Sequence, residues 1–132
     1  LDTAIQTLLT TTVYFKNNST DLINNQNLIL NQAVHTIQTI LQLQHKLKNP
    51  LQIVITGHTD SSGPEKLNLK LSRSRAEAVF NYLMNRGIHP SFLFIKGVAN
   101  KNPLKKEMTV NDRQFNRAVS FKPFYLLSSK GL

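Results

Sequence analysis

The chain has 132 residues, of which 40% are hydrophobic, and this is enough for one globular domain with a sizeable core. It contains no cysteine, which excludes a disulfide framework and a thiolate metal site but leaves the cellular compartment open. The 16 Lys and Arg exceed the 7 Asp and Glu, and the net charge of +9 favours an anionic partner such as nucleic acid, acidic lipid or an acidic cell-wall polymer.

The chain carries no sign of a membrane span. Its apolar runs are far shorter than the roughly 18 residues that a transmembrane helix needs. Because the sequence begins with Leu1, we expect it to be a piece of a longer protein. Any signal peptide or membrane anchor would then lie outside it.

The first predicted elements are a short helix and a strand. Residues 2–9 place apolar side chains at helical spacing, with Asp2 as the N-cap. Residues 10–15 are β-branched and aromatic, which favours a strand, and the polar residues 16–19 end it in a turn.

A long amphipathic helix and a buried strand come next. Between residues 26 and 48 apolar side chains recur every three or four positions, which is typical of a helix with one buried face. Asn49-Pro50 ends this helix, because the residue before a proline avoids the helical conformation. Residues 51–55 are apolar and β-branched, as in an interior strand buried on both faces.

The second half of the chain predicts one more helix and two more strands. Gly63 is the expected N-cap of the helix, Pro64 its first residue, and Gly87 its left-handed C-terminal cap. Further along, we expect a strand at 92–96, a loop at 97–112, a strand at 114–121 and a tail at 123–132.

These elements predict a two-layer α+β sandwich. After the short N-terminal helix, the order is strand, helix, strand, helix, strand, strand (β-α-β-α-β-β), and each long helix has one apolar face. Both helices are therefore expected to cover one side of a single mixed sheet. We expect one domain over residues 1–132, with a core of about 13–121, a lead-in segment at 1–9 and the tail at 123–132.

Polar residues gather where the second predicted strand leads into the second long helix. The segment Gly57-His58-Thr59-Asp60 precedes a helix on which Asn68, Ser72 and Arg75 share one face, because they are four and three residues apart. Polar side chains on the inner edge of a helix need a loop or a ligand to satisfy them.

Asp60 is the acidic counterpart of Arg75. The carboxylate could take an ammonium group while the guanidinium forks onto a carboxylate, so that together they would bind a zwitterion. The alternative is a buried ion pair between Asp60 and Arg75 that only pins the loop to the helix. The spacing of the two residues does not decide between these interpretations.

Other kinds of site find less support. His58 has no second ligand at a metal-binding spacing, so we expect no metal and no cofactor. Ser61 and Ser62 lack the glycine-flanked elbow of a nucleophilic serine. The acids are scattered and form no catalytic pair, so we expect a protein that is not an enzyme.

The spaced residues of this region resemble a known family, the OmpA-like peptidoglycan-binding domains of OmpA, Pal and MotB-type proteins. The resemblance spans residues 13–121. It is carried by Gly57-His58-Thr59-Asp60, Gly63, Asn68, Leu71-Ser72, Arg75-Ala76, Gly87-Ile88 and Asn116-Arg117. The sequence departs from the family pattern at Ala118, where a second Arg is expected, and at residues 97–100, where a glycine-rich segment is expected.

The resemblance implies non-catalytic binding of the peptide stem of peptidoglycan. Asp60 would take the ammonium group and Arg75 the carboxylate of a diaminopimelate side chain. The supporting pocket residues would be Asn68, Thr59, Ser61, Gly63, Asn17, Asn18 and Arg117.

The resemblance also implies a place and partners. It predicts a periplasmic domain that anchors a cell-envelope protein to the cell wall, with a membrane contacted only through an anchor outside this chain. Whether the domain forms a homodimer is left undecided by the sequence, although stator-type relatives dimerise. The alternative function, a basic module that binds nucleic acid or another polyanion, rests on charge alone, and no stacking platform or helix-turn-helix supports it. We therefore expect no nucleic-acid partner.

Overall fold

A computed structural model of the protein describes residues 2–44 and 51–125. Its helices and strands in chain order are α1 (Asp2–Leu9), β1 (Thr12–Tyr14), α2 (Gln26–Gln44), β2 (Leu51–Gly57), α3 (Glu65–Asn85), η1 (Pro90–Phe92), β3 (Leu93–Gly97), η2 (Val110–Asn116) and β4 (Ala118–Tyr125), where η denotes a 3₁₀ helix. The predicted order of long helices and strands is confirmed, and so is the short N-terminal helix.

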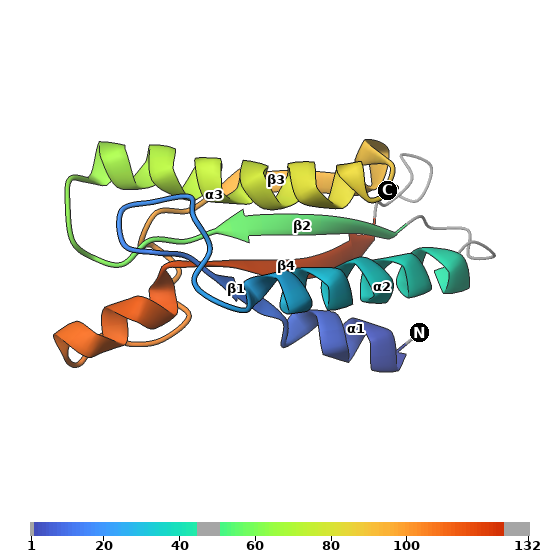
Figure 1. Cartoon of the computed structure of the whole chain (residues 1–132), viewed down its shortest axis with the longest axis horizontal. Helices are drawn as coiled ribbons and strands as arrows, with labels where there is room; N and C mark the ends of the chain where they lie inside the picture. The colour runs from blue at the N-terminus through green and yellow to red at the C-terminus, as the bar shows by residue number, and fades with distance from the viewer. Residues whose placement is uncertain (1, 45–50, 126–132) are drawn as a thin grey trace, which may run out of the picture.

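The four strands form one mixed sheet in the order β1-β4-β2-β3. Strands β2 and β3 are parallel, whereas β4 is antiparallel to both of its neighbours. In Figure 1, α2 and α3 run along the sheet and β2 is visible in the gap between them. The prediction of a two-layer α+β fold on a mixed sheet is confirmed.

The core lies between this sheet and the helices. Leu51, Ile53 and Ile55 alternate along β2 and are fully buried, as are Ile37 of α2 and Leu83 of α3. Burial stabilises each such side chain by about 1.5–3 kcal/mol relative to exposure. Within residues 2–44 and 51–125, no helix has the length and apolar character needed to cross a bilayer.

The last strand differs most from its prediction. The expected strand at 114–121 is wrong in its first part, because Val110–Asn116 wind into η2. The Asp112 carboxylate holds that turn by accepting hydrogen bonds from the backbone N–H groups of Met108 and Thr109 at 2.8 and 3.0 Å. The expected loop at 97–112 therefore ends before η2.

Strand β4 also runs on into the segment that was expected to be a tail. It continues through Pro123 to Tyr125, pairing with β2 as far as Leu51. Proline is tolerated there because β1 reaches only Ser120, so β4 has a single neighbouring strand at Pro123. The rest of the expected tail, residues 126–132, lies outside the described residues.

The ends of α3 support one prediction and correct another. Pro64, rather than Gly63, is the N-cap: its φ of −66° and ψ of 144° are extended, whereas Gly63 has a φ of +84°. Gly87 is the expected left-handed cap, with a φ of +96°. Its N–H bonds to the carbonyl of Met84, and the N–H of Ile88 to that of Leu83.

Other boundaries shift by a few residues. Strand β1 starts late because the N–H groups of Thr10 and Thr11 still close the last turn of α1. Strand β2 extends two residues beyond its predicted end, to Gly57, and β3 begins at Leu93 because Phe92 belongs to η1. The predicted end of α2 at Asn49-Pro50 lies outside the described residues.

Candidate ligand-binding site

The ends of β2 and β3 touch the first half of α3 directly. A Cβ atom on Gly57 would lie 1.7 Å from the carbonyl oxygen of Ser72, and one on Gly97 would lie 2.6 Å from the backbone nitrogen of Arg73. Only glycine allows so close an approach. The contact brings the polar face of α3 against the loops that leave the two strands.

Arg75 lies at the centre of this region and is only 1% exposed. Its Nε donates to the carbonyl of Ser19 at 2.9 Å, Nη1 to that of His58 at 2.9 Å and Nη2 to that of Lys16 at 3.1 Å. The guanidinium thus joins the loop after β1 to the loop after β2. Burial lowers the pKa of Arg75 to about 10, so the side chain stays charged at neutral pH.

Asp60 and Arg75 do not form the direct ion pair that was one of the two interpretations of their spacing. Asp60 instead accepts a hydrogen bond from Arg117 Nε at 2.7 Å, in an ion pair whose side chains are 6% and 20% exposed. The backbone N–H of Ser62 at 2.9 Å and the Ser62 hydroxyl also donate to the carboxylate. The interpretation of a structural ion pair between Asp60 and Arg75 is therefore wrong, because Asp60 pairs with Arg117 instead.

These contacts set the charge state of Asp60. Burial by itself raises the pKa of the carboxyl, but the hydrogen bonds from Ser62 and Arg117 and the positive charge of Arg117 outweigh it. The pKa of Asp60 therefore lies below its ordinary value, and the group is a carboxylate at neutral pH.

Asp60 and Arg75 nevertheless line one hollow, of about 320 Å³. Its walls come from the loops after β1 and β2 and from the first half of α3. They comprise Asn17, Asn18, Thr59, Asp60, Ser62, Gly63, Pro64, Leu67, Asn68, Leu71 and Arg75. Seven of these residues belong to the predicted site, and the hollow adds Ser62, Pro64, Leu67 and Leu71 to them.

Two polar groups of this hollow have hydrogen-bonding capacity to spare. A guanidinium carries five N–H groups, and three of those of Arg75 are used, which leaves two without a partner in the described part of the chain. The buried hydroxyl of Thr59 has no partner there either. A buried polar group without a partner costs about 1–3 kcal/mol, so a ligand that supplied acceptors here would be stabilised.

A family model described as the OmpA family matches residues 14–117. The chain belongs to the OmpA family. The match confirms the resemblance that the motif residues carry, and the family is a non-catalytic one, as the sequence predicted.

Relatives of this OmpA-family domain include whole proteins much longer than the chain. Outer membrane protein A of Bordetella avium is 39% identical over 70 residues, which are 53% of this chain and 36% of that protein. Peptidoglycan-binding protein ArfA of Mycobacterium tuberculosis is 35% identical over 68 residues, which are 52% of this chain and 21% of that protein. The chain thus spans little more than a third, or less, of these relatives.

Solved structures share the fold. The crystal structure of the peptidoglycan-associated lipoprotein from Burkholderia pseudomallei superposes with a TM-score of 0.71 at 23% identity. The superposition covers 86% of this chain and 90% of that one.

Several predicted site residues of the OmpA-family domain hold its loops. The Asn68 side chain donates to the carbonyl of Ser62 at 2.8 Å and so fixes the loop that carries Asp60. Ser61 does not line the hollow, because its hydroxyl and its N–H bond to the Glu107 carboxylate at 2.6 and 3.2 Å. Arg117 contacts Asp60 but lines a neighbouring hollow instead of this one.

Sequence reasoning missed Glu107 and the carbonyl groups that hold Arg75. Glu107 also accepts a hydrogen bond from Asn116 at 2.9 Å, so it ties the loop after β3 to the loop after β2. No spacing rule links an acid in one loop to a serine 46 residues away. The carbonyls of Lys16 and Ser19 belong to the backbone, so side-chain patterns do not point to them.

His58 has a structural position in this domain. It is 3% exposed, and its Nε2 lies 2.8 Å from the hydroxyl of Ser120 on β4. Burial lowers the pKa of His58, so the ring is neutral at pH 7. No group of three His, Asp or Glu side chains that could hold a metal occurs among residues 2–44 and 51–125.

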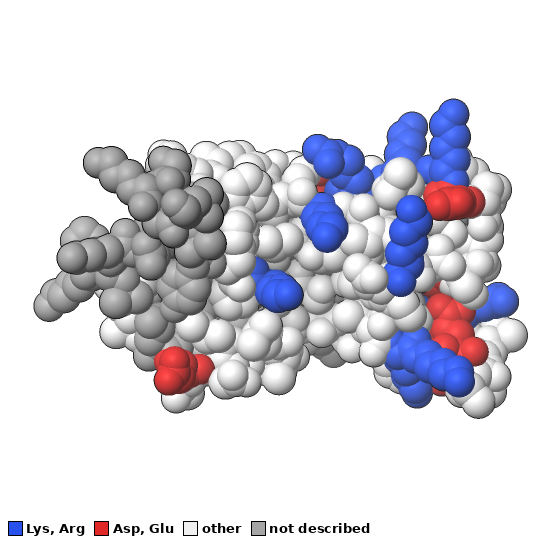
Figure 2. All heavy atoms as spheres, turned by 180° about the vertical axis from the view of Figure 1, so that it is seen from behind, with Lys and Arg blue, Asp and Glu red and all other residues white. Residues whose placement is uncertain are grey.

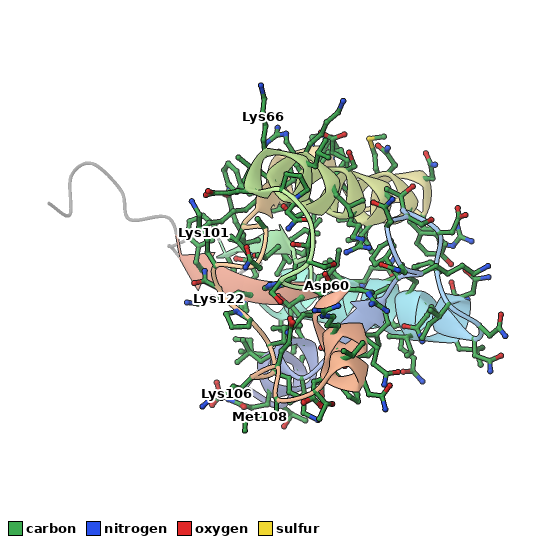
Figure 3. The ribbon with its side chains drawn as sticks, turned by 90° about the vertical axis from the view of Figure 1, so that its left-hand side faces the viewer. Asp60, Lys66, Lys101, Lys106, Met108 and Lys122 are labelled. Carbon is green, nitrogen blue, oxygen red and sulfur yellow. The ribbon has the colours of Figure 1, made fainter. Side chains whose placement is uncertain are left out.

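Positive charge surrounds the site at a distance. Figure 2 shows Lys and Arg side chains gathered over the end of the molecule that holds the loop after β2. In Figure 3, Asp60 lies inside this end, whereas Lys66, Lys101 and Lys106 lie at its periphery. Five of the seven acids pair with a cation, but no ion pair forms within the described residues at Lys16, Lys66, Lys70, Lys96, Lys106 and Lys122.

Proposed function

We propose that this domain binds the peptide stem of peptidoglycan without chemical turnover and thereby attaches a longer envelope protein to the cell wall. The sequence relative from Mycobacterium tuberculosis is named a peptidoglycan-binding protein. The structural relative from Burkholderia pseudomallei is named a peptidoglycan-associated lipoprotein. Because peptidoglycan lies in the periplasm of Gram-negative cells, we place the domain there, with its membrane anchor outside this chain.

The observation that carries the proposal is a buried cation without a counter-ion. Arg75 is held only by neutral carbonyl groups, and the one acid beside it, Asp60, is engaged with Arg117. Two guanidinium groups and one carboxylate leave the region with an excess positive charge. A ligand carboxylate in the hollow would accept the two remaining N–H groups of Arg75 in a forked pair and neutralise that charge.

Asp60 supplies the complementary half of the site. A carboxylate has about four lone-pair positions, and here three donors occupy some of them, which leaves room for an ammonium group. The side chain of diaminopimelate ends in both an ammonium group and a carboxylate, so it meets Asp60 and Arg75 together. The unpartnered hydroxyl of Thr59 would add a third polar contact.

Binding to purified peptidoglycan sacculi by an Asp60→Asn variant tests the ammonium half. Asparagine keeps the shape of the side chain but removes its charge, so we expect retention on sacculi to weaken roughly tenfold or more, as for loss of a charge-assisted hydrogen bond. Glu77→Gln is the matched control, because it removes one exposed negative charge from the far side of α3. Equal retention of Asp60→Asn and Glu77→Gln, both with native circular dichroism, contradicts the proposal.

Changing the ligand tests the carboxylate half without disturbing Arg75. A stem peptide with lysine in place of diaminopimelate keeps the ammonium group and lacks the side-chain carboxylate. We expect its affinity, measured by calorimetry, to fall roughly 10- to 100-fold relative to the diaminopimelate peptide. Equal affinities would remove Arg75 from the assignment.

The lysines that form no ion pair within the described part of the chain favour a second, non-specific attraction to anionic polymers. Such binding falls steeply with added salt, because it releases counter-ions. Binding through Asp60 and Arg75 in a partly enclosed hollow should change far less between low and moderate salt. A salt titration with sacculi and with generic DNA separates the two.

A further inference from the structure

A second hollow adjoins the first, on the other side of the Asp60–Arg117 ion pair. It measures about 350 Å³ and is lined by Tyr14, Phe15, Lys16, Asn17, Ile23, Gln114, Phe115 and Arg117. Asn17 lines both hollows. Arg117 lines the second hollow while its Nε holds Asp60, which lines the first. A ligand longer than one residue could therefore occupy both.

One side of the second hollow is apolar and carries three aromatic rings and an isoleucine. The rings of Tyr14 and Phe115 meet edge to face with centroids 6.5 Å apart, and Phe15 is a buried wall residue. Ile23 and Phe115 are 40% and 37% exposed, although they are large apolar side chains. Covering them would remove apolar surface from water, which is favourable.

The hollow also has a cationic side without an acid. Besides the Nε bond to Asp60, the guanidinium of Arg117 makes no hydrogen bond in the described part of the chain, so its terminal nitrogens are available. Lys16 is exposed and forms no ion pair within residues 2–44 and 51–125. None of the lining residues is acidic. An apolar chain that ends in a carboxylate fits this combination of walls.

We infer that the second hollow binds the apolar, carboxylate-terminated end of the same peptide. The inference rests on the proposed function, because it takes the diamino acid to lie in the first hollow. A peptide that continues with alanine residues would place their methyl groups against Tyr14, Ile23 and Phe115. Its terminal carboxylate would meet Arg117 and Lys16. The domain would then discriminate between stem peptides by their free ends.

Three synthetic peptides test this inference by calorimetry on the 132-residue chain. The first ends at diaminopimelate as an amide, the second continues with two D-alanines to a free carboxylate, and the third is the C-terminal amide of the second. We expect the free acid to bind about tenfold more tightly than the short peptide, through two buried methyl groups and one charged contact. The extended amide should lose most of that gain.

Variants locate the effect in the hollow. Ile23→Ser should reduce the affinity ratio of the extended acid to the short peptide, and Lys16→Gln should reduce the ratio of the acid to its amide. Phe94→Ala is the matched control, because Phe94 is 45% exposed on β3 and does not line either hollow. It should leave both ratios unchanged.

The outcomes separate the two proposals. If all three peptides bind equally, the second hollow is not a subsite, and the proposed function stands. If the extended acid binds tighter but Ile23→Ser and Phe94→Ala act alike, the gain arises elsewhere and the inference is also overturned. If none of the peptides binds, both the proposed function and the inference fail.

Discussion

The two halves of the buried face of α3 are alike in burial and opposite in chemistry. Toward its start, Asn68, Ser72 and Arg75 are 8%, 0% and 1% exposed, and toward its end Val79 and Leu83 are 1% and 0% exposed. The polar half hydrogen-bonds with backbone groups: Asn68 and Arg75 with loop carbonyls, Ser72 with the carbonyl of Leu69 and the N–H of Ala99. The apolar half packs against the sheet.

The apolar half of this face mainly stabilises the fold, whereas the polar half mainly fixes the positions of particular loops. Apolar burial stabilises the fold without directing any particular loop. The net contribution of buried hydrogen bonds is small, since each replaces a bond to water, but a donor left unpaired is costly. The polar half therefore determines where three loops must lie, and these loops shape the candidate site. Variants in each half should have different consequences for stability and for the loops.

The largest loss of stability should come from the apolar half. Leu83→Ala leaves a cavity in the core, and we expect the free energy of unfolding to fall by about 2–5 kcal/mol. Urea denaturation followed by circular dichroism measures this loss. Peptide affinity of the folded fraction should stay unchanged, and a parallel loss of affinity would mean that the two halves are coupled.

A smaller loss with a local signature should come from the polar half. Arg75→Met keeps much of the side-chain volume but leaves the carbonyls of Lys16, Ser19 and His58 without their donor. We expect a loss of about 2 kcal/mol, since the loops can turn part of these groups toward water. Amide hydrogen exchange should quicken in the loop at 16–21. Arg73→Met, on the exposed side of the same helix, is the control and should change neither quantity.

Acid should weaken the link between Asp60 and Arg117. The pKa of Asp60 is lower in the folded state than in the unfolded state, so the unfolded chain binds the proton first. The stabilisation is complete above pH ~4, the pKa region of an unfolded Asp, and is lost as the pH falls through the lower folded value. Asp60→Asn should flatten this part of the stability curve, measured by urea denaturation between pH 2 and 6.

Asp112 provides the comparison for that experiment. Its pKa is also lowered, by hydrogen bonds from Lys105, Met108 and Thr109. An Asp112→Asn variant should therefore flatten the same acid region while leaving binding in the hollow of Asp60 and Arg75 intact, because no residue of η2 lines that hollow. If Asp60→Asn leaves the acid region of the curve unaltered, the carboxylate is not held as the structure indicates.

The smallest effect should be a gain of stability. Ala99 has a φ of +53°, a left-handed conformation that disfavours any residue with a Cβ, and it lies where the family pattern expects glycines. Ala99→Gly should relieve this strain and stabilise the domain by about 0.5 kcal/mol after the greater entropy of the unfolded glycine is subtracted. Ala118→Gly, in a buried strand position, should destabilise it instead. Thermal unfolding checks both predictions: the midpoint temperature should rise for Ala99→Gly and fall for Ala118→Gly.

The order of the main helices and strands could be predicted from the amino-acid sequence. The periodicity of α2 and α3 and the β-branched run in β2 depend on neighbouring side chains, so local patterns reveal them. Residues of the polar hollow could be predicted for a similar reason, because Asp60, Asn68 and Arg75 lie within one strand, loop and helix unit. The strand at the end of the chain was placed incorrectly, because the hydrogen bonds of Asp112 favour a turn in η2 over the strand that residues 114–121 suggested.

The pairing of the charged residues, by contrast, depends on how distant parts of the chain pack together. Asp60 pairs with Arg117, 57 residues away, and Arg75 donates to carbonyls 56 and 59 residues away, rather than to the acid 15 residues before it. The register between β4 and β2 brings Arg117 to Asp60, and the close approach at Gly57 and Gly97 seats Arg75 among the loops. Contacts of this kind follow from how whole elements pack, so the spacing of residues along the chain does not contain them.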